Sequence, residues 1–224
     1  MDFVRLLSES FDYTKEALWG RWVRWLLLLI STIIFPLIYG YTVRVMSGTK
    51  PAPDLEGWLG LFIDGIKLLV ITIIYSIPLT ILTLLPVALY FIPVSATTTP
   101  GTGSGSLLSP ELGVVAALVI FVIFIVAAII IGILSTFAAV RFARMGRMGE
   151  AFRIRTLLTH IGRIGWINCF IALLVMGIVI AIVVFVLMLI PIVGLILLLL
   201  LSPAFIIFSA RYIALLYESA PAPA

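Results

Sequence analysis

The chain has little charge, one cysteine and one histidine. Only 11% of its 224 residues are charged, whereas 63% are hydrophobic, and the mean hydropathy is +1.32. A soluble domain averages about 25% charged and about 45–50% apolar residues, and a chain of this length cannot bury so large an apolar excess. The composition excludes a soluble enzyme, a nucleic-acid reader, a disulfide-stapled secreted domain and a disordered chain.

Residues that carry chemistry are equally scarce. Cys169 and His160 are the only cysteine and the only histidine, so the chain can form no internal disulfide and has no second partner for a Cys or His metal site. A phosphate-cradling glycine loop and a nucleophile elbow are also missing. We therefore expect no cofactor, no metal and no enzymatic activity, and we expect His160 to be an interfacial side chain.

Long stretches of the sequence contain almost no charged residue. Between positions 68 and 140 the only charged residue is Glu111, and between 164 and 210 there is none. Proton-coupled pumps need ionisable groups at depth in the membrane, and many selectivity filters use rings of charge. The pattern argues against both classes.

Five apolar segments indicate membrane crossings. They cover residues 25–43, 68–91, 112–140, 166–190 and 195–216. Four are expected to span, whereas the first barely matches a hydrocarbon core about 30 Å thick and is interrupted by Pro36 and Gly40. It either spans once or turns back at Pro36. The fold class is thus an all-α integral membrane protein, a helical bundle of four to five transmembrane segments plus interfacial amphipathic helices, with one transmembrane domain over residues 25–218.

The remaining segments have their own patterns. Residues 1–24 read as an amphipathic interfacial helix, because Phe3, Leu6, Leu7, Phe11 and Leu18 recur at helical spacing. Residues 55–67 form a second amphipathic stretch that leads directly into a span. Residues 93–111 form a low-complexity loop without Lys or Arg, and residues 219–224 a disordered tail.

Three of the apolar segments contain residues that favour bending or close packing. Pro36, Gly40, Pro78 and Pro86 are candidate hinges or kinks, and the hydroxyls of Thr80 and Thr83 are candidates for the carbonyls that proline leaves without a donor. In the third span, Ala128, Gly132 and Thr136 form a ladder of small residues at four-residue spacing, a candidate helix-packing site.

The basic segment 141–164 is the best candidate in the sequence for a site that binds a partner. Its six arginines are the candidate contacts for lipid headgroups or a protein: Arg141, Arg144, Arg147, Arg153, Arg155 and Arg163. Because Lys and Arg concentrate in cytoplasmic loops, the segment is expected inside, together with Arg211, and loop 93–111 outside, in a multi-pass protein of the cell membrane. The cluster either only sets this orientation, or it also binds anionic lipids or an acidic partner.

The side of the N-terminus is left open by the sequence. Arg5, Lys15, Arg21 and Arg24 favour the cytoplasmic side, whereas a first segment that spans would place them outside.

Short motifs along most of the chain resemble the DUF4013 family of uncharacterised membrane proteins, which is common in archaea. They lie in GYTVRVMSGTKPAPDLEGWLGLFIDGIKLLVITIIYSIP, GRMGEAF and SARYIALLYE. The matching positions are Gly40, Tyr41, Arg44, Gly48, Phe62, Asp64, Gly65, Tyr75, Pro78, Glu150, Ala151, Phe152, Arg211, Tyr212 and Tyr217. The run KPAPDLEG departs from the Leu-Pro-Glu-like run expected there. The resemblance implies a multi-pass membrane protein of unknown function and supplies no catalytic residues.

The sequence favours a non-enzymatic structural or accessory protein, or a lipid-interacting scaffold with a basic cytoplasmic face. The alternatives are an oligomeric small-solute or lipid transporter or channel built around the proline-kinked second span, and a subunit of a larger membrane complex. Expected partners are anionic lipid headgroups, and either further copies of the chain or other subunits of a membrane complex, but no nucleic acid.

Overall fold

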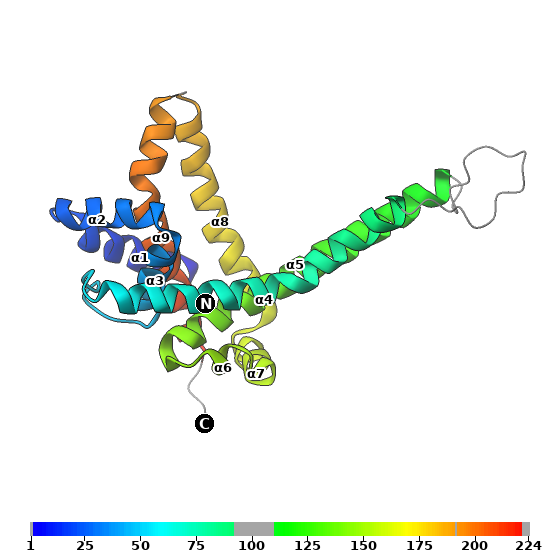
Figure 1. The fold of residues 1–224 in the computed structure, drawn as a ribbon, viewed down its shortest axis with the longest axis horizontal. Helices are drawn as coiled ribbons and strands as arrows, with labels where there is room; N and C mark the ends of the chain where they lie inside the picture. Colours follow the sequence, from blue (N-terminus) through cyan, green and yellow to red (C-terminus); the bar gives the residue numbers. More distant parts are fainter. Residues whose placement is uncertain (1, 92–109, 191, 221–224) are drawn as a thin grey trace, which may run out of the picture. The chain divides into compact units, whose positions relative to one another are not determined.

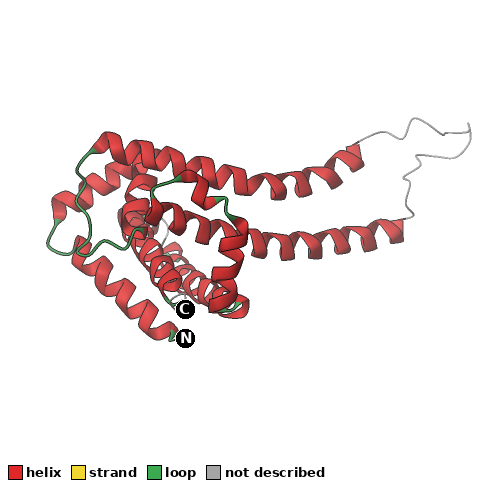
Figure 2. Cartoon of the chain, turned by 90° about the horizontal axis from the view of Figure 1, so that it is seen from below, coloured by secondary structure: helices red, strands yellow, loops and turns green. Residues whose placement is uncertain are grey.

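The computed structural model describes residues 2–91, 110–190 and 192–220, and these residues contain helices and no strand (Figure 2). In chain order the helices are α1 (Phe3–Leu18), α2 (Trp22–Ile33), α3 (Phe35–Met46), α4 (Trp58–Phe91), α5 (Pro110–Met145), α6 (Met148–Ala151), α7 (Ile154–Ile164), α8 (Trp166–Met188) and α9 (Val193–Glu218) (Figure 1). Loop 93–111 lies mainly outside the described residues, as does most of the tail.

Four of the described helices are long and apolar enough to cross a membrane. They are Trp58–Leu84 within α4, Leu118–Met145 within α5, Trp166–Met188 and Val193–Glu218. Each falls on a segment that the sequence predicted to span, and α4 also includes most of the amphipathic stretch before its span. The prediction of an all-α, multi-pass membrane protein is confirmed.

The chain divides into two compact units. One comprises residues 1–72 and 133–224, and the other comprises residues 73–132 of α4, α5 and their connection. In the first unit α8 and α9 pack side by side as a hairpin (Figure 1), and α9 also contacts α1, α2 and α3. The candidate functional site lies in this unit.

The first apolar segment bends back on itself. Helix α2 ends at Ile33 and α3 begins at Phe35, with the break at Ile34 (φ −96°, ψ 84°). Pro36 falls in the first turn of α3, where its missing N–H costs no helical bond, and Gly40 lies inside α3. The structure therefore has two short helices here in place of one straight span.

The contacts of Asp54 show how sharp this bend is. Arg24, at the start of α2, pairs with the Asp54 carboxylate, and Arg44, near the end of α3, donates to the Asp54 carbonyl at 3.2 Å. In a straight helix these two arginines would lie about 30 Å apart. Both ends of residues 22–46 thus return to the same loop, which supports the alternative that this segment re-enters.

Helix α1 lies at the same end of the unit as the basic segment. The Tyr13 hydroxyl donates to the carbonyl of Thr49 at 3.1 Å. The neighbouring Gly48 lies beside the ion pair of Arg144 and Glu218, whose nearest atoms would be 3.4–3.5 Å from a Cβ at this glycine. The N-terminal helix, loop 47–57 and the ends of α5 and α9 therefore meet.

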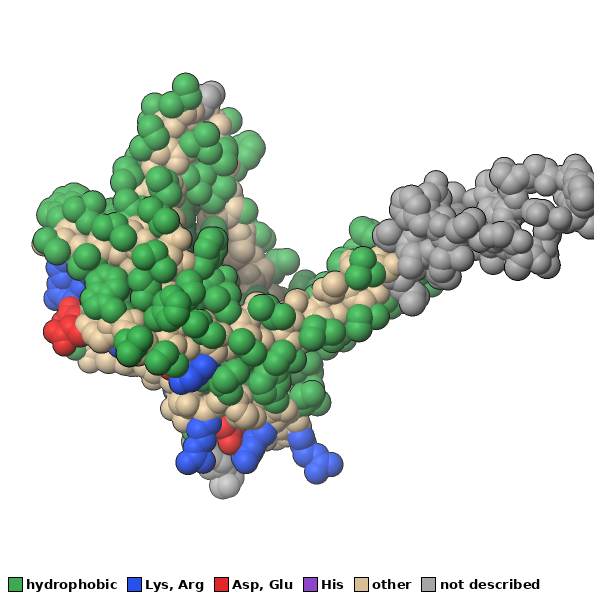
Figure 3. Space-filling model, in the orientation of Figure 1, with side chains coloured by type: hydrophobic (Ala, Val, Ile, Leu, Met, Phe, Trp, Pro, Cys, Tyr) green, Lys and Arg blue, Asp and Glu red, His purple; other side chains and the backbone are tan. Residues whose placement is uncertain are grey.

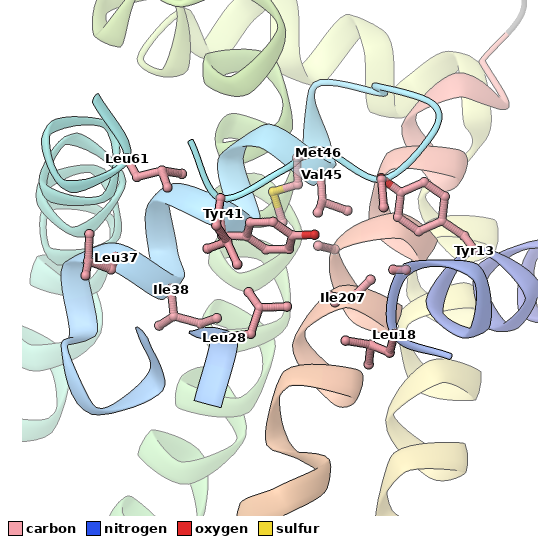
Figure 4. Close-up of a cluster of buried hydrophobic side chains, with 14 of the residues drawn as sticks. Tyr13, Leu18, Leu28, Leu37, Ile38, Tyr41, Val45, Met46, Leu61 and Ile207 are labelled. Atoms are coloured by element: carbon pink, nitrogen blue, oxygen red, sulfur yellow. The ribbon is translucent and has the colours of Figure 1, made fainter. Parts of the chain in front are cut away.

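The core of this unit surrounds α3. Tyr41, Val45 and Ile38 pack with Leu61 of α4 and Ile207 of α9 (Figure 4). Helices α3 and α4 approach closely, because a Cβ at Gly40 would overlap the carbonyl oxygen of Leu61 and a Cβ at Gly65 would overlap that of Pro36. Only glycine permits this backbone contact.

The helices pass through their internal prolines. Helix α4 continues through Pro78 and Pro86. Contrary to expectation, Thr80 and Thr83 donate to the carbonyls of Ser76 and Thr80, at 3.0 and 2.8 Å. Neither hydroxyl reaches the carbonyl four residues before Pro78, which is the one that loses its helical donor.

Helix α9 shows the arrangement that was expected in α4. Pro203 lies inside it, and the Ser202 hydroxyl donates at 2.7 Å to the carbonyl of Leu199, four residues before the proline. A side-chain hydroxyl thus restores the bond that the proline removes.

The small-residue ladder lies along α5. Ala128 and Thr136 are half-buried, and a Cβ at Gly132 would meet no heavy atom within 4 Å. Space for a neighbouring helix therefore exists at Gly132, and its use for helix packing stays a prediction.

Candidate functional site

The six predicted arginines lie at the end of α5 and along α6 and α7. Figure 3 shows Lys and Arg side chains gathered at this end of the unit, whereas hydrophobic side chains cover the α8–α9 hairpin. The structure separates the arginines into two groups, according to whether a carboxylate holds them.

Glu150 holds two of the six. Its Oε2 accepts from Arg141 Nη2 at 2.5 Å and from Arg141 Nε at 3.1 Å, and its Oε1 lies 3.1 Å from Arg153 Nη1. The hydrogen bond from Arg141 lowers the pKa of the Glu150 carboxyl from its usual value. Arg141 is largely buried in this pair, with 12% of its side chain exposed. It therefore joins α5 to α6 and is poorly placed to contact lipids.

Arg144 joins α5 to α9. Its Nη2 lies 2.5 Å from Glu218 Oε1, and its guanidinium carbon lies 5.2 Å from the centroid of the Tyr217 ring. A charged hydrogen bond and a cation–π contact thus hold this arginine at a helix junction.

Arg147, Arg155 and Arg163 form the second group, which we call the free arginines. All three are exposed, and their side chains form no hydrogen bond or ion pair within the described residues. Arg147 precedes α6, whereas Arg155 and Arg163 lie on α7. Their charges are available to groups outside the chain.

Helix α7 places the free arginines beside apolar surface. Leu157, Ile161 and Ile164 form its buried face, while Ile154 and Leu158 remain 53% and 41% exposed. A helix with exposed apolar side chains next to arginines is typical of one that lies at the membrane–water interface.

His160 is on α7 but does not point freely into the interface. Its ring stacks on that of Tyr217, with centroids 4.0 Å apart, and its Nε2 lies 3.0 Å from the Tyr217 carbonyl oxygen. That carbonyl belongs to the last turn of α9, which lacks helical donors. These two contacts join α7 to α9. Partial burial also lowers the pKa of the imidazole.

Sequence reasoning missed the position of Arg211. Because Arg211 stands beside Tyr212 near the inner end of a span, the sequence predicted only that it lies on the cytoplasmic side. In the structure it is 1% exposed, and its guanidinium carbon lies 5.1 Å from the Tyr13 ring centroid. The sequence signal for this contact was the amphipathic pattern of α1, but the buried face differs from that pattern. Leu6 and Leu18 are buried as expected, whereas Phe11 is exposed. The other buried residues of α1 are Ser10, Tyr13, Thr14 and Ala17.

Two open grooves flank α1 and α2. One, of about 490 Å³, is lined by Phe11, Thr14, Lys15, Leu18, Trp19, Trp25 and Ala204. The other, of about 530 Å³, lies between the start of α2 and residues 54–56. Among the described residues no group of three or more His, Cys, Asp or Glu side chains could hold a metal ion.

Comparison with known proteins gives one match. The model of the family described as "Protein of unknown function (DUF4013)" matches residues 25–192, while no curated protein and no solved structure matches the chain. The match covers the bent segment α2–α3, three of the four spanning helices and the basic segment, and it agrees with the resemblance seen in the sequence. The chain belongs to the DUF4013 family of proteins of unknown function.

Proposed function

We propose that the protein is a non-enzymatic membrane scaffold that gathers anionic lipids at its basic face through Arg147, Arg155 and Arg163. The observation that carries the proposal is the exposure of these three arginines, none of which forms an ion pair among the described residues. Basic residues next to a span attract anionic headgroups by about 1 kcal/mol each.

The distribution of charge supports a one-sided function. All 14 Lys and Arg residues lie outside positions 68–140 and 164–210, and the bend at Ile34 brings the N-terminal ones to the basic end. By the bias of Lys and Arg toward the cytoplasm, this face is cytoplasmic in a cell membrane.

The test is lipid enrichment around the reconstituted protein. We would measure energy transfer from the protein's tryptophans to labelled phosphatidylglycerol or labelled phosphatidylcholine in mixed vesicles, at low and high salt. Wild type should enrich the anionic lipid at low salt. The triple variant Arg147→Gln, Arg155→Gln, Arg163→Gln should lose most of that enrichment.

A matched control removes the same charge elsewhere. Lys15 and Arg21 are exposed on α1 and before α2, and Lys67 is half-exposed on α4, so their triple change to Gln gives an equal loss of net charge. It should retain most of the enrichment. Equal losses in the two triple variants, or no enrichment in wild type, would show that the free arginines are not the binding surface.

A further inference from the structure

Arg211 is a buried cation, and two of its three guanidinium nitrogens lack hydrogen-bond acceptors among the described residues. It is 1% exposed, and its Nε and Nη1 have no hydrogen-bond partner within the described residues. The Tyr13 ring, 5.1 Å from the guanidinium carbon, attracts a cation, but it does not replace oxygen acceptors for these N–H groups. Burying a charged group with unsatisfied donors is costly. The packing of α1 over Arg211 leaves Nε and Nη1 without oxygen acceptors in the described part of the chain.

Glu9, an acid within electrostatic range of Arg211, does not supply these acceptors. Glu9 lies within electrostatic range of both Arg211 and Lys50, but its carboxylate accepts from Arg5 Nε at 2.6 Å. The bond with Arg5 is also the main reason that the pKa of Glu9 is lowered, with Lys50 and Arg211 contributing less. Two cations thus act on a carboxylate that a third cation holds.

Small side chains form part of the buried face of the helix that covers Arg211. Ser10, Thr14 and Ala17 are on the buried face of α1, and α9 is its main neighbour. The hydroxyls of Ser10 and Thr14 donate to carbonyls of α1 itself, at 2.6 and 2.8 Å. These hydroxyls therefore donate no hydrogen bond across the α1–α9 contact.

The connection to α2 and the outer face of α1 are compatible with a second position of α1, away from α9. Gly20, which follows α1, has φ +75°, and a Cβ there would meet no atom within 4 Å, so no described side chain packs against the connection to α2 at this point. Phe11 and Trp19 are 63% and 76% exposed beside Lys15. A helix with such a face also binds a membrane surface.

We propose that Arg211 is a covered binding site for a phosphate group and that α1 is its cover. The planar guanidinium matches phosphate oxygens, and Lys50 adds a second positive charge that acts, like that of Arg211, on Glu9. When α1 turns away about Gly20, the phosphate provides the acceptors that Arg211 lacks in the packed state. This gain offsets the lost contact with Tyr13. The phosphate comes from an anionic lipid headgroup or from free phosphate.

The experiment measures the distance between α1 and α9 in the full chain. Spin labels are attached at Ser8→Cys and Ser219→Cys, both exposed, in a Cys169→Ala background. Distances are recorded in phosphatidylcholine vesicles with and without phosphatidylglycerol, and in detergent with sodium phosphate or with sodium chloride at equal ionic strength. We expect the ratio of long to short distances to rise about tenfold with the phosphate source, as for a tenfold difference in affinity between the two states.

The two arms distinguish the sources. A rise only with phosphatidylglycerol assigns the site to a lipid headgroup, and a rise with inorganic phosphate in detergent assigns it to free phosphate. Both results support the proposal. No rise in either arm, or an equal rise with chloride, would overturn it.

Variants connect the response to Arg211. Arg211→Met keeps much of the side-chain volume but has no donors, and it should leave the short distance unchanged in every condition. The variant with Gln at positions 147, 155 and 163 should respond as wild type does, which separates this site from the proposed function. If Arg211→Met does not insert into vesicles, Arg211→Lys decides, because lysine keeps the charge without the planar fork. A full response in whichever of the two inserts would overturn the proposal.

Discussion

Nη2 of Arg144 lies 2.5 Å from Oε1 of Glu218, although 74 residues separate them in the chain. Because Arg144 ends one spanning helix and Glu218 ends another, this pair joins α5 to α9 at the basic end. It also removes one arginine from the set that can bind lipids. The carboxylates thus decide which of the six arginines remain free.

We expect Glu218→Gln to lower stability modestly. The side chains of Arg144 and Glu218 are 27% and 38% exposed, so solvent screens the pair and its loss should cost at most about 1 kcal/mol. The double exchange Arg144→Glu, Glu218→Arg should recover part of this loss. Thermal unfolding of wild type, Arg144→Glu, Glu218→Arg and the double exchange in detergent gives the coupling directly. A coupling of zero would mean that the pair does not hold α5 to α9.

Stability should fall as the pH drops through the range where His160 titrates. Burial lowers the pKa of the folded imidazole, so the folded state prefers the neutral ring. This contribution is fully present above the unfolded pKa of about 6.5 and is lost as the pH falls through the lower, folded value. We expect His160→Phe, which keeps an aromatic ring against Tyr217, to show a smaller loss between pH 8 and pH 5, measured as the shift in melting temperature. Equal losses in the two proteins would contradict the prediction.

Two glycine substitutions should have opposite effects. Gly65→Ala places a methyl group on the carbonyl oxygen of Pro36, so α3 and α4 must separate, and we expect a loss of about 1–3 kcal/mol. Gly132→Ala meets open space within α5, where alanine gains up to about 1 kcal/mol of helix propensity. Melting temperatures should therefore fall for the first variant and stay equal or rise for the second. A similar fall in both would indicate that the close α3–α4 approach is not the cause.

Tyr41→Phe should not destabilise the protein. The Tyr41 hydroxyl is buried within the core around α3 and has no hydrogen-bond partner among the described residues. Removing an unsatisfied buried polar group is neutral or favourable, by up to about 1–3 kcal/mol. Tyr41→Leu, which also removes the ring, should be clearly destabilising. A marked fall in melting temperature for Tyr41→Phe would show that the hydroxyl has a partner, such as a buried water.

Hydropathy and charge along the chain were enough to predict the membrane, the helices and the position of each span. These properties depend on a window of about 20 residues, and the bilayer requires every backbone group within such a window to be bonded locally. The segment around Pro36 could not be decided in this way, because its length and proline fit both alternatives. In the structure, the contacts of Arg24 and Arg44 with Asp54 show that the chain bends back at this point.

The sequence by itself thus determined the solvent, the helical architecture and the basic segment of this protein. Only the tertiary structure decided that Glu150 and Glu218 hold Arg141, Arg153 and Arg144, and that Arg211 is buried beneath α1. The residues that flank an arginine in the sequence are similar whether its side chain contacts a carboxylate, an aromatic ring or a lipid. Its environment depends on where distant helices pack, and that is set by the sum of many small contacts across the bundle.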